Sequence, residues 1–165
     1  MNRVLLALLL ALPGIAWADA KIAYLDVRKA VEATKAGQKA KKELETEFKS
    51  KQKELEGREK DIQKMGEDFQ KKSMVLSEDV RGKKQVEIQE QMMKFRELAQ
   101  KHQQSLQSRE RELFEPILEK MKKAIEKVAK DDGYSMVLDK AGNGLVWAES
   151  KFDITDKVVQ TYEKL

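Results

Sequence analysis

The longest pattern in the chain is a seven-residue repeat of apolar side chains that begins near residue 38. One position of the repeat is apolar five times in succession, at Phe48, Leu55, Ile62, Phe69 and Leu76. A repeat of this period is typical of a helix that packs against a second helix in a coiled coil. The sequence therefore predicts a long helix with one apolar seam.

The companion seam position of the same repeat is only partly apolar. Leu44 and Met65 are apolar, whereas Lys51, Arg58 and Lys72 carry charge. A half-occupied seam cannot form a tight zipper along its whole length. We therefore expect helices that can separate.

A second apolar stripe runs from about residue 86 to residue 130, with alternating steps of four and three. Near its end two steps of four follow each other, a stutter that locally unwinds a left-handed supercoil. The stripe also widens there, which predicts better packing in that half. Pro116 predicts a kink, because proline removes a backbone donor and clashes with the preceding turn. The stripe comprises Ile88, Met92, Phe95, Ala99, His102, Leu106, Arg109, Leu113, Ile117, Met121, Ala124 and Val128.

A turn is predicted between the two stripes, over residues 75–84. Ser77 is a suitable N-cap, and Glu78 and Asp79 follow in the first helical turn, where acids are favoured. Gly82 is unfavourable inside a helix, so we expect an irregular tip. Residues 38–130 are thus predicted to form an antiparallel helical hairpin, roughly 60 Å long at 1.5 Å per residue.

The segment before the hairpin predicts a strand and a short helix. Residues 21–26 alternate in polarity as a strand does, and residues 27–35 have helical spacing. Gly37 marks a break before the long helix.

The segment after the hairpin predicts more strands and a final helix. Gly133 is a natural helix terminator, and residues 134–139 predict a strand. Residues 141–144 are rich in glycine and predict a tight turn, followed by a returning strand over residues 145–148. A last helix begins at residues 154–156. Residues 19–37 and 131–165 therefore form a small α/β body, and the fold class is α+β, mainly α.

The predicted body has a thin sheet with unpaired edges. Sheets of two or three strands are marginal by themselves, and open edges favour pairing with other chains. We therefore expect the body to assemble with other copies of the chain, chiefly through Ile22, Tyr24, Val137, Leu145 and Trp147.

The N-terminus has the three-part layout of a secretory signal peptide. Arg3 precedes an unbroken apolar run over residues 4–12, Pro13 breaks it, and residues 16–18 read Ala-Trp-Ala. The apolar run is shorter than the ~20 residues that a spanning helix needs. Residues 1–18 are therefore predicted to be cleaved, and we expect a bacterial periplasm as the destination.

Composition and charge agree with exposed helices. Charged residues make up 38% of the chain, aromatic residues 6%, and cysteine is absent, so the fold is held by packing or by association of subunits. Residues 38–130 have a net charge of +5, and the two body segments together have −2. Acids nearly as numerous as bases argue against a nucleic-acid partner.

The sequence offers little for catalysis. His102 is the one histidine, thiols are absent, and neither a phosphate-binding loop nor a nucleophile elbow is present. We interpret His102 as a seam residue that is partly buried. We expect no enzyme activity, no metal and no cofactor.

Methionine and phenylalanine gather in the distal half of the hairpin, and two interpretations stay open. Unbranched methionine often fills gaps in a helical seam, but flexible methionine-rich faces also suit promiscuous binding. The candidate binding residues on the inner face of the hairpin are Met65, Phe69, Met92 and Phe95.

The tip is basic, and here too two interpretations stay open. It is either a solvated end of the helices or a contact for anionic lipid head groups or lipopolysaccharide. Its cations are Lys71, Lys72, Arg81, Lys83 and Lys84.

The order of these segments resembles the Skp/OmpH family of periplasmic chaperones. The resemblance covers the whole mature chain and rests on KIAYLD at 21–26, LSEDVR at 76–81, DGYSMVLD at 132–139, LVWA at 145–148 and DITDKVV at 153–159. It implies a homotrimer in which three bodies share a β-rich core and three hairpins enclose a cavity. It also implies that the protein holds unfolded outer-membrane proteins without ATP.

Two functions of different class follow from the sequence. The first is a holdase chaperone for unfolded β-barrel precursors. The second is a structural coiled-coil spacer of the cell envelope, which would need a continuous dry seam. The polar seam residues favour the first, because they predict arms that separate and adapt.

Overall fold

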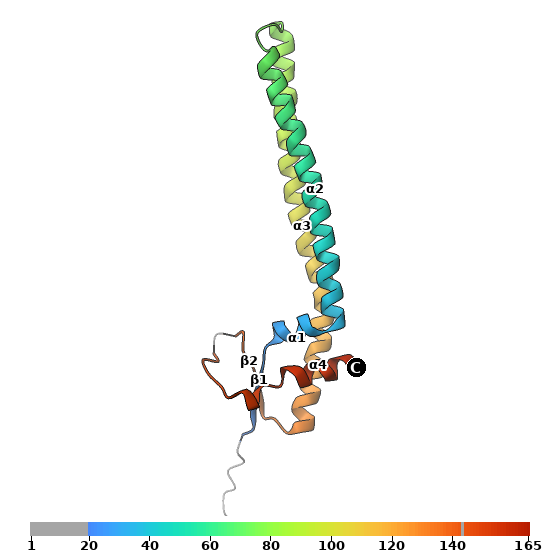
Figure 1. Cartoon of the computed structure of the whole chain (residues 1–165), viewed down its shortest axis with the longest axis vertical. Helices are drawn as coiled ribbons and strands as arrows, with labels where there is room; N and C mark the ends of the chain where they lie inside the picture. The colour runs from blue at the N-terminus through green and yellow to red at the C-terminus, as the bar shows by residue number, and fades with distance from the viewer. Residues whose placement is uncertain (1–19, 143) are drawn as a thin grey trace, which may run out of the picture.

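The protein is a long helical hairpin mounted on a small α/β body (Figure 1). The computed structural model describes residues 20–142 and 144–165, so the predicted signal peptide lies outside the described residues. None of the described helices is long and apolar enough to cross a membrane. The elements are β1 (Ile22–Leu25), α1 (Val27–Ala33), α2 (Lys35–Lys72), α3 (Glu78–Asp132), β2 (Met136–Asp139), a 3-10 turn (Ser150–Phe152) and α4 (Thr155–Lys164).

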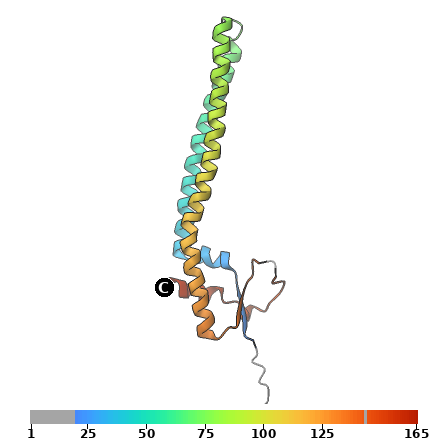
Figure 2. The same ribbon diagram turned by 180° about the vertical axis from the view of Figure 1, so that it is seen from behind.

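The hairpin is the crossover between two parallel strands. β1 and β2 pair in parallel, with Ile22 opposite Met136 and Leu25 opposite Asp139. Parallel neighbours cannot be joined by a tight turn, so the chain must leave the sheet and return. Here it leaves through α1 and α2 and returns through α3, as the views from the front and from behind both show (Figures 1 and 2).

A buried threonine joins the body to the hairpin. The Oγ1 atom of Thr34 donates to the carbonyl of Val31 at 2.8 Å and accepts from the N–H of Gly37 at 2.9 Å. Thr34 thus ends α1 and caps α2 with one hydroxyl. A Cβ atom on Gly37 would lie 2.0 Å from the Val31 carbonyl oxygen, so only glycine fits there.

The core lies at the base of the hairpin. The widened end of the apolar stripe packs α3 against α4 and α1, and β1 closes one side. The predicted packing of this half is confirmed. Buried core residues include Leu25, Ala30, Val31, Ile117, Met121, Ala124, Val128, Ile154, Val158 and Tyr162.

The helix ends lie at the predicted capping positions, with one correction at the tip. Gly133 takes the left-handed conformation at φ 71° and ends α3, as predicted. Ser77 is the N-cap of α3, but the helix starts at Glu78 and includes Gly82, so the tip is shorter than expected. The acids of the first turn favour this early start. α3 runs through Pro116 as one continuous helix, and the kink predicted there stays a prediction.

The predicted returning strand is wrong. Residues 145–148 form no strand, and the sheet of the described residues has two strands, extended only by a bridge between Tyr24 and Asp153. One residue of the predicted turn, Asn143, lies outside the described residues. β2 is half-buried at Val137 alone, so a strand added at its free edge has no layer to pack against.

Candidate functional site

Three polar contacts join α2 and α3 across the seam of the hairpin. Nε2 of His102 lies 3.0 Å from Oε2 of Glu54, and the histidine side chain is 12% exposed. Nearer the body, Nη2 of Arg109 lies 3.2 Å from Oε2 of Glu43, and its Nε lies 3.8 Å from Oε2 of Glu47. These contacts hold the proximal halves of the two helices together.

Arg109 is the centre of an acidic cluster. Its Nη1 also lies 3.0 Å from Oε1 of Glu112 on its own helix. The hydrogen bond to Glu112 raises the pKa of Arg109, and the charges of Glu112, Glu43 and Glu47 add to the effect. The neighbouring acids therefore favour the charged guanidinium.

The expectation that polar seam residues keep the arms apart is wrong for His102 and Arg109. Both residues bridge the helices, because acids of α2 lie opposite them. Arg58 and Lys72 differ, since both are exposed. Distal to the Glu54–His102 contact, the ion pairs of the described residues lie within one helix rather than between helices.

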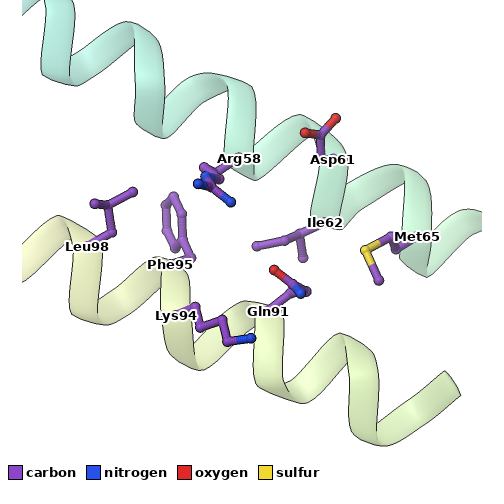
Figure 3. Close-up of a pocket in the computed structure, with 8 residues that line it drawn as sticks. All are labelled: Arg58, Asp61, Ile62, Met65, Gln91, Lys94, Phe95 and Leu98. Atoms are coloured by element: carbon purple, nitrogen blue, oxygen red, sulfur yellow. The ribbon is translucent and has the colours of Figure 1, made fainter. Parts of the chain in front are cut away.

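The seam opens into a pocket just beyond that last contact. The pocket has a volume of about 390 Å³ and lies between α2 and α3. Ile62 and Met65 reach into it from α2, and Phe95 and Leu98 reach into it from α3 (Figure 3). Arg58, Asp61, Gln91 and Lys94 form its polar rim.

A second and more open pocket lies next to the tip. Its volume is about 760 Å³, and its apolar lining includes Phe69, Met74 and Ile88. Arg81 lines the same pocket, and its Nη2 lies 3.4 Å from the carbonyl of Leu76. We call these two openings the middle pocket and the tip pocket.

The four candidate binding residues fall into different places. Met65 and Phe95 meet in the middle pocket, and Phe69 lines the tip pocket. Met92 lines neither pocket and is 43% exposed. Sequence reasoning noted Ile62 and Ile88 only as seam residues, yet their position between the two helices makes them pocket walls.

Two of the lysines at the basic tip are paired with acids of their own helices. Lys71 lies 3.8 Å from Glu67, and Lys84 lies 2.8 Å from Glu87, each on its own helix. Lys72 and Lys83 are exposed. Contact of this tip with anionic lipid or lipopolysaccharide stays a prediction.

Of the residues predicted to mediate assembly of the body, some are buried within the chain and others are exposed. Tyr24 lies in the core of the chain itself, and Val137 and Leu145 are half-buried. Ile22 is exposed, and Trp147 is 78% exposed beside Val146, which is 99% exposed.

The base of the hairpin carries a shallow apolar groove that the sequence did not single out. Its volume is about 460 Å³, and its apolar walls are Leu44, Phe48 and Leu106. All three belong to the apolar repeat, and the repeat alone does not show which seam residues pack tightly and which line a groove.

The carboxylates near the pockets are dispersed rather than grouped. Over the described part of the chain, no three histidine, cysteine or acidic side chains are grouped as a metal would need. The middle pocket contains a single carboxylate, from Asp61, rather than a pair.

Comparison with known proteins identifies the family. The profile of the OmpH-like outer membrane proteins matches residues 21–162, and the chain belongs to this family, as the sequence resemblance predicted. No curated protein matches the sequence.

A solved structure confirms the fold. The chain is similar to a proposed outer membrane chaperone (OmpH-like) from Caulobacter crescentus CB15, with a TM-score of 0.74 and 18% sequence identity. The similarity covers 87% of this chain and 83% of the other.

Proposed function

We propose that this protein is an ATP-independent holdase chaperone of the periplasm, which keeps unfolded outer-membrane β-barrel proteins soluble. The observation that carries the proposal is the change along the hairpin seam. In the proximal half, ion pairs to Glu43 and Glu54 bridge the two helices, whereas the distal ion pairs of the described residues stay within one helix and two pockets there combine apolar side chains with an arginine. Membership of the OmpH-like family and the description of the Caulobacter protein support the same role.

The distal arms suit a partner that has no fixed shape. Methionine and phenylalanine supply adaptable apolar contact, and the surrounding lysines and arginines supply charge that attracts acidic segments over a distance. Binding by many weak contacts does not require a folded epitope. A spacer protein, by contrast, would gain from a seam that stays closed to the tip.

The proposed active form is a homotrimer assembled through the body. The support is an exposed apolar surface that a single copy leaves uncovered, which includes Ile22, Met136 and Trp147. Sedimentation of the mature protein at micromolar concentration should give the mass of three chains. A stable monomer would contradict this part of the proposal.

The holding activity is tested by diluting an unfolded outer-membrane β-barrel protein from urea into buffer, with and without the mature protein and without nucleotide. Light scattering should stay low when the chaperone is present in excess. Aggregation at the same rate in both samples would leave the spacer function as the better account.

The contribution of charge is tested by association rates across a salt series. Long-range attraction is screened within about 8–10 Å at ordinary ionic strength, so salt should slow capture more than it speeds release. Replacing Lys71, Lys72, Lys83 and Lys84 by glutamine should mimic high salt.

A matched control keeps the net charge of that variant. Replacing the exposed Lys39, Lys42, Lys122 and Lys123 by glutamine removes the same charge near the body instead. Equal slowing by both variants would mean that net charge, rather than the tip, governs capture.

A further inference from the structure

The middle pocket and the tip pocket are built from the same kinds of side chain. The middle pocket combines Ile62, Met65 and Phe95 with Arg58. The tip pocket combines Ile88, Met74 and Phe69 with Arg81. In both, the two helices contribute from opposite sides. The recurrence indicates one kind of ligand group for both pockets.

The size of the middle pocket suits a ring. Its volume of about 390 Å³ exceeds the ~150 Å³ of an engineered apolar cavity that binds benzene. The room is therefore sufficient for a single ring or for the double ring of an indole.

The side chains around the middle pocket can make favourable contacts with the π-electron system of an aromatic ring. Arg58 extends from α2 toward Phe95, which rises from α3 (Figure 3). A guanidinium attracts the face of an aromatic ring, and phenylalanine packs against its edge or face. The sulfur of Met65 adds a favourable contact with a ring edge. An aliphatic side chain could fill the same space but would gain none of these contacts.

The rim of the pocket also offers a partner for a polar ring substituent. Gln91 points from α3 across the gap toward Ile62 (Figure 3). Its side-chain oxygen can accept a hydrogen bond from an indole N–H or a phenol O–H. Tryptophan and tyrosine combine an apolar body with such a donor, whereas phenylalanine does not.

We propose that both distal pockets receive aromatic side chains of the bound polypeptide, with a preference for tryptophan and tyrosine. The inference rests on the proposed function and names the part of the client that is recognised. Transmembrane β-barrels carry girdles of aromatic residues at both membrane interfaces, so their unfolded chains present many such groups.

The first test observes the pocket directly in the full mature protein. Methyl NMR of protein labelled at the methionine methyl groups reports on Met65 inside the pocket and on Met93, which is exposed and lines neither pocket. The Met65→Leu variant identifies the resonance. The ligand is an unfolded outer-membrane β-barrel protein, either unaltered or with every tryptophan, tyrosine and phenylalanine replaced by leucine.

The expected result is a ring-current shift of the Met65 methyl resonance with the unaltered client only, and a much smaller shift for Met93. The altered client should also dissociate about fivefold faster or more, because it lacks the aromatic contacts. Equal shifts and equal lifetimes for both clients would overturn the inference while leaving the holding function intact. Failure to hold either client would overturn the proposed function itself.

A pair of variants tests whether the positive charge of Arg58 contributes to the preference for aromatic side chains. Arg58→Gln should reduce the difference in lifetime between the two clients, whereas Arg96→Gln, an exposed position outside both pockets, should keep it. Far-ultraviolet circular dichroism verifies that both variants stay helical. If Arg96→Gln reduces the difference as much as Arg58→Gln does, the cationic rim of the pocket has no specific role.

Discussion

Loss of the Thr34 hydroxyl, which links α1 to α2, should lower the stability of the protein clearly. Thr34→Val keeps the shape of the side chain but removes the group that accepts from the Gly37 N–H and donates to the Val31 carbonyl. Thr34 is fully buried, so water cannot replace the lost acceptor. An unpaired buried N–H costs about 1–3 kcal/mol, and loss of an N-cap costs a similar amount.

These two costs describe the same lost bond, so we expect about 2 kcal/mol of destabilisation rather than their sum. For a chain of this size that corresponds to a fall in Tm of about 4–8 °C. Urea unfolding followed by circular dichroism at fixed chain concentration measures the change.

Two further variants make the test specific. Thr34→Ser keeps the hydroxyl and should lose only the burial of one methyl group, about 1 kcal/mol. Thr46→Val removes a hydroxyl that donates to the carbonyl of Lys42 on the exposed surface of α2, and it should change stability by no more than about 0.5 kcal/mol. Equal effects of Thr34→Val and Thr46→Val would refute the argument.

Three other predictions follow from the structure. Hydrogen exchange should be fast over residues 60–95 and slow over residues 113–128, because the core and the cross-hairpin ion pairs lie at the proximal end; uniform protection would contradict this. Burial raises the pKa of Tyr162, and the charge of Glu163 adds to the effect. The fold favours the neutral phenol, so this contribution to stability is complete below a pH of about 10 and is lost as the pH rises through the raised pKa. The difference in unfolding free energy between the wild type and Tyr162→Phe should therefore change across that alkaline range and stay constant below it. Gly57→Ala lies in a helix with open space around the new Cβ and should stabilise by about 0.5–1 kcal/mol. Gly133→Ala should destabilise by about 1–2 kcal/mol because φ is 71°. Urea unfolding should give these opposite signs, and a shared sign would count against the conformational reasoning.

Much of the candidate site could be foreseen from the repeat, although its shape could not. The distal cluster of Met65, Phe69 and Phe95 was evident from composition and spacing. A seam repeat, however, does not distinguish side chains that touch from side chains that leave a gap between them. That difference depends on which residues of the two helices face each other, and hence on the length of the turn.

The elements with local causes could be predicted from the order of residues alone. Periodic apolar positions predicted the two long helices, and Gly133 predicted the end of α3. Ser77 and the two acids after it predicted its start, although the Ser77 side chain makes no capping hydrogen bond. These features depend on residues within a few turns of each other, and a single chain segment contains all the information they need.

Contacts between residues far apart in the chain depend instead on how the elements pack. His102 contacts Glu54 and Arg109 contacts Glu43 because the loop at the tip fixes the register of the two helices. Two polar positions that were expected to weaken the seam therefore bridge the helices. Residues 145–148 have strand-like composition but stay unpaired, because Val137 alone of β2 is partly covered and an added strand would have little core against which to bury its side chains. Burial against a second layer is a property of the whole assembly of elements, so no local pattern could supply it.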